Sequence, residues 1–181
     1  MKRGLVVVDL QNEYLSTGKL PLSGIEAAAA NASWVIAHAR NTDIPVFHIR
    51  HEAGSDDADI FIKGSDGAQI QSAVAPNGKE PVIVKKHINA FRETDLKKQL
   101  DAFNIQEIVV IGAMSHMCVD ALVRAAVDMG YPVTVLHDAC ATLDLSFGGV
   151  TVPAAHTHAA MMAAFEFGYA TVKSVEDYLS A

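Results

Sequence analysis

The sequence has few cysteines and no long apolar run, and each shortage excludes a class of protein. Two cysteines among 181 residues are too few for the disulfide framework of a small secreted domain. No apolar stretch approaches the roughly 20 residues needed to cross a bilayer. The apolar run at residues 5–8 is too short for the apolar region of a signal peptide. We therefore expect a soluble, reduced, cytoplasmic protein that does not associate with membranes.

Positive charge is also in short supply. The chain has 14 Lys and Arg against 21 Asp and Glu, which gives a formal net charge of -7. Nucleic-acid binders hold phosphates with clustered basic residues, so this class of partner is excluded. Half of the residues are hydrophobic and 19% are charged, which argues against extended disorder. The length suits a single domain over residues 1–181.

Short runs rich in β-branched residues alternate with helical patterns along the chain. The strand-like runs cover residues 5–8, 46–49, 82–84, 108–112, 133–136 and 170–172. Helical patterns cover residues 25–40, 94–103 (capped by Thr94), 118–129, 153–167 and a last stretch capped by Ser174. Two long loops, 51–80 and 139–153, interrupt the alternation. The pattern predicts a Rossmann-like three-layer α/β/α sandwich with a doubly wound, mainly parallel, six-stranded sheet.

Three reactive side chains fall at the predicted strand ends, where ligands bind in open α/β sheets. Asp9 follows the first strand, Lys85 ends the third, and Cys118 opens the helix after the fourth. A helix N-terminus favours the nucleophilic thiolate form of a cysteine. A partly desolvated carboxylate is a suitable general base, and a nearby ammonium would stabilise the thiolate. Together, these residues indicate nucleophilic catalysis.

Each of the three residues also has an ordinary interpretation. Cys118 alone is typical of a buried structural cysteine. Asp9 suits a helix cap or a turn, and Lys85 suits a solvated charge beside Lys86. The catalytic interpretation therefore depends on the three positions taken together.

Four short segments, spread over nearly the whole chain, carry a more specific pattern. They are VVDLQNEY at 7–14, VKKHINAF at 84–91 with TDL at 94–96, GAMSHMCV at 112–119 and DACAT at 138–142. In their order and spacing they resemble the isochorismatase-like cysteine hydrolases, a family that includes nicotinamidases, carbamoyl-amide hydrolases and isochorismatases. The resemblance implies that Asp9, Lys85 and Cys118 form a catalytic triad. It also implies a cis peptide between Ala113 and Met114, and an oxyanion hole formed by the N–H groups of Met114 and Cys118.

The resemblance implies an amidohydrolase-type reaction without a cofactor. The expected substrate is a small amide, ureido or carbamoyl compound, whose C–N bond is cleaved through a thioester on Cys118. One alternative is an isochorismatase-type enol-ether hydrolase that uses Asp9 as acid. Another is a non-catalytic module on the same fold that binds a small molecule or a protein. Family members assemble as dimers or tetramers, so a homo-oligomer is expected.

The histidines after the second strand depart from the nicotinamidase pattern, in which an Asp-x-His and a further His bind a metal. Here residues 48–52 read His-Ile-Arg-His-Glu, followed by Asp56, Asp57 and Asp59. Two histidines three residues apart on an extended segment point to opposite faces. We therefore predict no metal, and a solvated or core position for His48 and His51.

Several further residues have two open interpretations. Gln11 and Tyr14 line the pocket near Asp9, or they pack within their loop. His116 contacts the substrate, or it packs against the following helix. His156 and His158 serve packing or subunit contacts. Cys140 is expected in the core, and Met161, Met162, Phe165 and Phe167 are expected in the core or at an interface.

Overall fold

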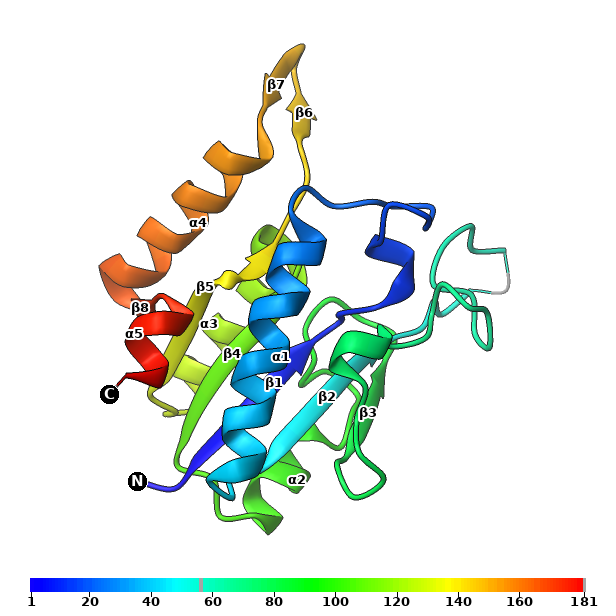
Figure 1. The fold of residues 1–181 in the computed structure, drawn as a ribbon. Helices are drawn as coiled ribbons and strands as arrows, with labels where there is room; N and C mark the ends of the chain where they lie inside the picture. Colours follow the sequence, from blue (N-terminus) through cyan, green and yellow to red (C-terminus); the bar gives the residue numbers. More distant parts are fainter. Residues whose placement is uncertain (56, 181) are drawn as a thin grey trace.

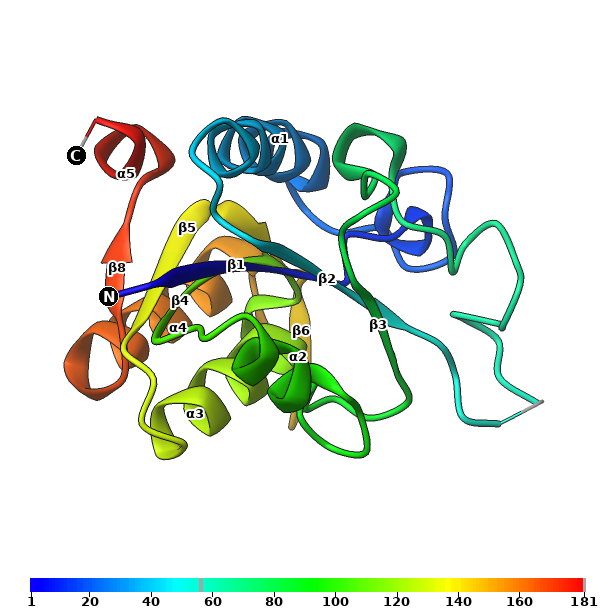
Figure 2. The same cartoon turned by 90° about the horizontal axis from the view of Figure 1, so that it is seen from below.

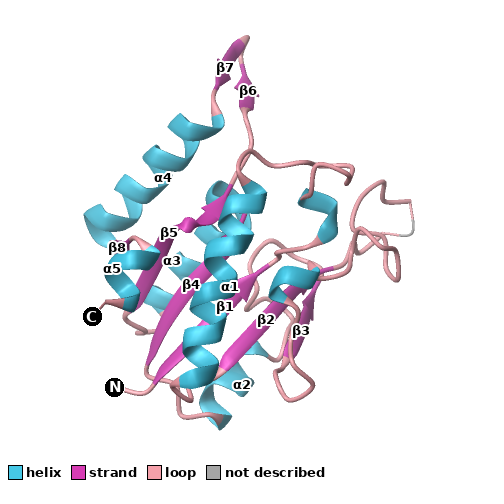
Figure 3. Ribbon diagram, in the orientation of Figure 1, coloured by secondary structure: helices cyan, strands magenta, loops and turns pink. Residues whose placement is uncertain are grey.

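The computed structural model describes residues 1–55 and 57–180, so Asp56 lies outside the described residues. Six strands form one sheet in which every neighbouring pair is parallel. Their order is β3 (Val82–Lys85), β2 (Val46–His51), β1 (Arg3–Val8), β4 (Glu107–Ala113), β5 (Val133–Ala141) and β8 (Thr171–Lys173). The predicted doubly wound α/β fold is confirmed (Figures 1 and 3).

Helices cover both faces of the sheet. Figure 2 shows α1 (Ile25–Asn41) and α5 (Val175–Leu179) on one face. The opposite face carries α2 (Leu96–Ala102), α3 (Asp120–Asp128) and α4 (Ala154–Gly168). Short helical turns, η1 (Asn12–Tyr14), η2 (Ser72–Val74) and η3 (Ser115–Val119), lie in the connections. Among the described residues, no helix combines the length and apolar character needed to cross a membrane.

The central strand β1 is apolar on both sides because each side faces a layer of helices. Val6 and Val8 belong to the core cluster that includes residues of α2, α3 and α4. Leu5 and Val7 belong to the cluster that includes the buried face of α1. Successive side chains of a strand point to opposite faces, so an uninterrupted apolar run fills both cores.

The segment between β5 and α4 differs from the predicted loop. Strand β5 continues to Ala141, and the chain then forms an antiparallel hairpin of β6 (Leu145–Phe147) and β7 (Val150–Val152). Gly148 and Gly149 connect the two strands, with φ values of 58° and 80° that favour glycine. The hairpin projects beyond the sheet at the start of α4 (Figure 1).

Two predicted helix starts have different outcomes. Helix α2 begins at Leu96 with Asp95 as its N-cap, so the predicted cap at Thr94 is wrong by one residue. The Thr94 hydroxyl instead accepts the Leu96 N–H at 3.3 Å within the preceding turn. The cap at Ser174 is confirmed, since its Oγ accepts the Asp177 N–H at 3.0 Å.

Candidate active site

Asp9, Lys85 and Cys118 meet at the C-terminal edge of the sheet. Lys85 Nζ lies 2.8 Å from Asp9 Oδ2 and 3.2 Å from Cys118 Sγ. Their exposed fractions are 0% for Asp9, 1% for Lys85 and 4% for Cys118. The three strand-end residues singled out in the sequence therefore form one buried cluster.

Each residue of this cluster comes from a different strand end. Asp9 follows β1 with a left-handed φ of 48°, and Lys85 is the last residue of the edge strand β3. Because β2 lies between β3 and β1, the long lysine side chain reaches across the end of β2. Cys118 lies in the π-helical turn η3, and α3 begins two residues later than predicted, at Asp120.

Strand β4 approaches β1 closely just before η3, the turn that carries Cys118 and is called the nucleophile turn below. Gly112 has a φ of 129°, and a Cβ at this position would lie 2.0 Å from the carbonyl oxygen of Val8. Only glycine fits this position without moving a strand. One residue further along, the peptide bond between Ala113 and Met114 is cis.

Burial and mutual charge shape the acid–base properties of Asp9 and Lys85. Burial raises the pKa of Asp9, and the Lys85 ammonium offsets part of this rise. Burial alone would lower the pKa of Lys85, but its interactions with Asp9 and Cys118 outweigh burial and raise the pKa. The lysine therefore stays an ammonium, while the carboxylate becomes a stronger base than an exposed aspartate.

The surroundings of Cys118 disfavour its thiolate form. Burial, followed by the charge of Asp9, raises the pKa of Cys118 to about 12, with Lys85 acting in the opposite direction. Desolvation opposes the thiolate more strongly than the Lys85 ammonium favours it. At neutral pH the Cys118 side chain is thus a neutral thiol.

Gln11 and Tyr14 lie beside this cluster and are both buried. The Gln11 amide donates to the carbonyl oxygens of His51 and Ala68, each at 2.8 Å, and accepts the His51 N–H at 2.7 Å. Tyr14 packs edge-on against Phe61, with 5.2 Å between ring centroids. These contacts support the walls of the site, and direct substrate contact by either residue stays a prediction.

Sequence reasoning missed two residues around the site. His51 Nδ1 lies 3.1 Å from Lys85 Nζ, although a solvated or core position was expected for this histidine. The pairing of His51 with Lys85 in the sheet register would have indicated this contact. That register can be assigned only when the strand order is known. The buried carboxylate of Glu13 accepts the N–H groups of Phe61, at 2.9 Å, and of Lys19, at 3.0 Å. It thereby ties the loop after β2 to the loop after β1.

His48, His116 and His158 contact residues outside the cluster. His48 is buried with its Nε2 2.9 Å from Glu80 Oε2. His116 Nδ1 lies 2.6 Å from the Thr142 hydroxyl, and substrate contact by His116 stays a prediction. His158 contacts the Ser115 hydroxyl at 2.8 Å, which joins α4 to the nucleophile turn.

The remaining His and Cys side chains of the described residues do not form a metal site. His156 is exposed on α4, whereas Cys140 packs in the core. Within residues 1–55 and 57–180, no group of three or more His, Cys, Asp or Glu side chains is arranged to hold a metal ion.

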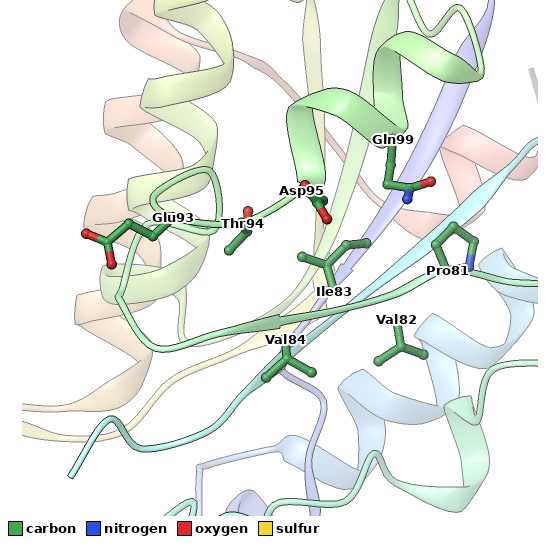
Figure 4. A pocket seen from close by; sticks show the side chains of 8 residues that line it. All are labelled: Pro81, Val82, Ile83, Val84, Glu93, Thr94, Asp95 and Gln99. Atoms are coloured by element: carbon green, nitrogen blue, oxygen red, sulfur yellow. The ribbon is translucent and has the colours of Figure 1, made fainter.

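A cavity of about 580 Å³ lies along the outer edge of the sheet, away from the buried cluster. Figure 4 shows Val82 and Val84 of β3 on one side of it, with Thr94 and Asp95 before α2 on the other. None of Asp9, Lys85 or Cys118 lines this cavity. Its volume therefore carries no information about the chemistry of the cluster.

The comparisons with known proteins agree with this arrangement. The family model of the isochorismatase domain matches residues 3–177. The isochorismatase family protein YddQ of Bacillus subtilis is 46% identical, over 99% of each chain. A solved isochorismatase from Pseudomonas putida KT2440 is 36% identical with a TM-score of 0.91, covering 97% of this chain and 89% of that one.

A solved structure with a named reaction is also similar. The N-carbamoylsarcosine amidase of Thermoplasma acidophilum is 27% identical with a TM-score of 0.83, covering 97% of each chain. The family match spans nearly the whole sequence and includes all three residues of the buried cluster. The chain therefore belongs to the isochorismatase family of hydrolases.

Proposed function

We propose that this hydrolase cleaves the C–N bond of a small amide, ureido or carbamoyl compound through a thioester on Cys118. The observation that carries the proposal is the contact of a carboxylate, an ammonium and a thiol in a site screened from water. The similarity to an N-carbamoylsarcosine amidase supports the substrate class.

The first half of the reaction forms the thioester. The Asp9 carboxylate takes the proton of the Cys118 thiol, and the resulting thiolate attacks the carbonyl carbon. The Lys85 ammonium stabilises the negative charge on sulfur. The oxyanion that forms is held by the N–H groups of Met114 and Cys118. Asp9 then gives its proton to the leaving nitrogen, and ammonia or an amine departs.

The second half of the reaction hydrolyses the thioester and releases the acid product. A water molecule enters after the amine has left, and Asp9 takes one of its protons while the water oxygen attacks the thioester carbon. Collapse of this second tetrahedral intermediate breaks the C–S bond, and the Asp9 proton returns to the sulfur. The site ends with a neutral thiol and a free carboxylate, as it began.

The thiol favours amide cleavage over the enol-ether alternative. Cleavage of an isochorismate-like enol ether needs an acid such as Asp9 but no nucleophilic sulfur. Here the sulfur lies 3.2 Å from a buried ammonium, a contact that a pure acid mechanism or a binding module does not use.

The test is ammonia release from a panel of small amides, ureido acids and carbamoyl compounds. We expect at least one compound to be hydrolysed by the wild type, and Cys118→Ala to lower its rate by about 10⁴-fold or more. Cys140→Ala is the matched control, because Cys140 is the other buried cysteine and has no contact with Lys85 among the described residues. A substrate hydrolysed equally well by Cys118→Ala would refute the covalent mechanism.

We also propose that the protein works as a homo-oligomer in the cytoplasm. Helix α4 exposes Ala155, Ala159, Ala163 and Phe167, which follow each other at four-residue spacing. The hairpin before it exposes Phe147. A continuous apolar helix stripe of this kind suits contact with a second copy of the chain.

A further inference from the structure

Resting on the proposed function, we propose that His51 is a positioning residue that fixes the direction of the Lys85 ammonium. In the structure, His51 Nδ1 lies 3.1 Å from Lys85 Nζ. The imidazole is thereby the third partner of an ammonium that also contacts Asp9 and Cys118.

The sheet register places the two side chains together. His51 is the last residue of β2 and pairs with Lys85, the last residue of β3. Residues paired across neighbouring parallel strands point to the same face, with their strands about 4.8 Å apart. The contact is therefore set by the backbone and does not depend on a flexible loop.

An ammonium has three N–H donors. Here Nζ forms an ion pair with Asp9 Oδ2 at 2.8 Å, donates to Cys118 Sγ at 3.2 Å, and lies 3.1 Å from the imidazole nitrogen. With one donor held by the imidazole, the ammonium is fixed in the rotation that keeps Nζ against the carboxylate and the sulfur. Without an acceptor at His51, this rotation is no longer fixed.

The imidazole fills this role only when it is neutral. To accept from Lys85, Nδ1 has to be unprotonated, with the ring hydrogen on Nε2. Burial, then the charges of Lys85 and His87, lowers the pKa of His51 to about 4. At neutral pH the ring therefore accepts a hydrogen bond and adds no second positive charge beside the ammonium.

His51 is held through both its backbone and its ring. The Gln11 side chain bonds the backbone N–H and C=O of His51, at 2.7 Å and 2.8 Å. Phe61 packs edge-on against the imidazole, with 5.2 Å between centroids and a 90° interplanar angle. Gln11 follows Asp9 by two residues, so the same short motif carries Asp9 and anchors the backbone of the histidine.

The test compares His51→Asn with His51→Leu. Asn carries its Oδ1 as many bonds from Cβ as the His Nδ1, so it keeps an acceptor near Lys85, whereas Leu keeps volume without one. The readout is the rate at which iodoacetamide alkylates Cys118 as a function of pH, followed by mass spectrometry of the Cys118 peptide. Measuring this rate requires no substrate. Because the Cys118 peptide is followed by itself, the reaction of Cys140 does not contribute.

We expect His51→Asn to stay within about threefold of wild type at pH 7. His51→Leu should react about tenfold more slowly, with its profile displaced by about one pH unit to higher pH. A wild-type profile in His51→Leu would overturn the proposal. So would an equal loss in His51→Asn, because the ring packing and not the acceptor would then matter. If His51→Leu does not fold, His51→Ala with added imidazole replaces it, and failure of imidazole to restore alkylation overturns the proposal equally.

The two proposals fail in different ways. If Cys118→Ala hydrolyses the panel compounds as fast as the wild type, the covalent mechanism of the proposed function is wrong. If Cys118→Ala abolishes hydrolysis but His51→Leu keeps the wild-type alkylation profile, the proposed function stands and only the role of His51 is lost. With an identified substrate, His51→Leu should lower kcat and leave KM nearly unchanged.

Discussion

Lys85 and Asp9 each depend on the other for the charge they carry inside the protein. Both side chains have an exposed fraction of 0%, and their charged atoms are 2.8 Å apart. Neither charge has water to stabilise it, so loss of one partner leaves the other uncompensated. The cost of such a loss appears in the stability of the fold as well as in catalysis.

This dependence predicts a non-additive pair of variants. Lys85→Met should lower the free energy of unfolding by about 3 kcal/mol at pH 7, because it leaves the Asp9 carboxylate buried and unpaired. The double variant Asp9→Asn, Lys85→Met should recover more than half of that loss, since no buried charge remains. Urea denaturation of the four proteins of this cycle measures the coupling. Strictly additive losses would show that the two charges do not stabilise each other.

Glu80 forms a second cluster of charged side chains, away from the active site. It accepts hydrogen bonds from Arg40 at 2.8 Å and from the Asn77 N–H at 2.9 Å, and it contacts His48 at 2.9 Å. Burial alone would raise the pKa of Glu80, but these three partners lower it to about 2. The carboxylate is thus more acidic in the folded chain than in the unfolded one.

A lowered pKa makes the contribution of Glu80 to stability depend on pH. The contribution is complete above about pH 4.5, the ordinary value for glutamate, and it is lost as the pH falls towards 2. Glu80→Gln should therefore lower the free energy of unfolding by about 1 kcal/mol at pH 6 and by less at pH 3. Urea titrations at the two pH values measure this. A loss of stability in Glu80→Gln that is larger at pH 3 than at pH 6 would contradict the lowered pKa of Glu80.

At Gly112, the absence of a side chain lets β4 lie close to its neighbour β1. Gly112→Ala should lower the free energy of unfolding by about 3 kcal/mol or more, because the new Cβ would lie 2.0 Å from the Val8 carbonyl oxygen. Gly168→Ala, at the end of α4, is the control, since nothing lies within 4 Å of its Cβ position. Thermal denaturation compares the two. Equal melting temperatures would mean that β4 moves away from β1 without cost.

Much of the arrangement of elements could be predicted, because buried parallel strands have a direct sequence signal. Apolar β-branched runs marked all six strands of the sheet, and the rule that ligands lie beyond strand ends brought Asp9, Lys85 and Cys118 together. The hairpin after β5 was missed because its strands have three residues each, with mostly exposed side chains. His51 was missed because its contact depends on which strand lies beside β2.

At the scale of the whole molecule, the exposed apolar stripe of α4 predicts the state of assembly. Phe167 is 96% exposed at the end of this stripe, a position that solvent alone does not favour. Phe167→Ser should shift the protein towards monomers in size-exclusion chromatography with light scattering. Met129→Ser, at an isolated exposed site after α3, is the control. A wild-type protein that is monomeric at all concentrations would contradict the proposed homo-oligomer.

The strand order also has a consequence for synthesis on the ribosome. Along the chain, β1, β2 and β3 are complete at Lys85, whereas β4, the other neighbour of β1, begins only at Glu107. If these three strands pair before β4 has left the ribosome, the half-sheet ends in β1, an apolar strand whose unpaired edge would invite association with other nascent chains. Such a half-sheet would carry Asp9 and Lys85. Cys118 follows β4 in the chain, so its sulfur would join them only once that edge is covered.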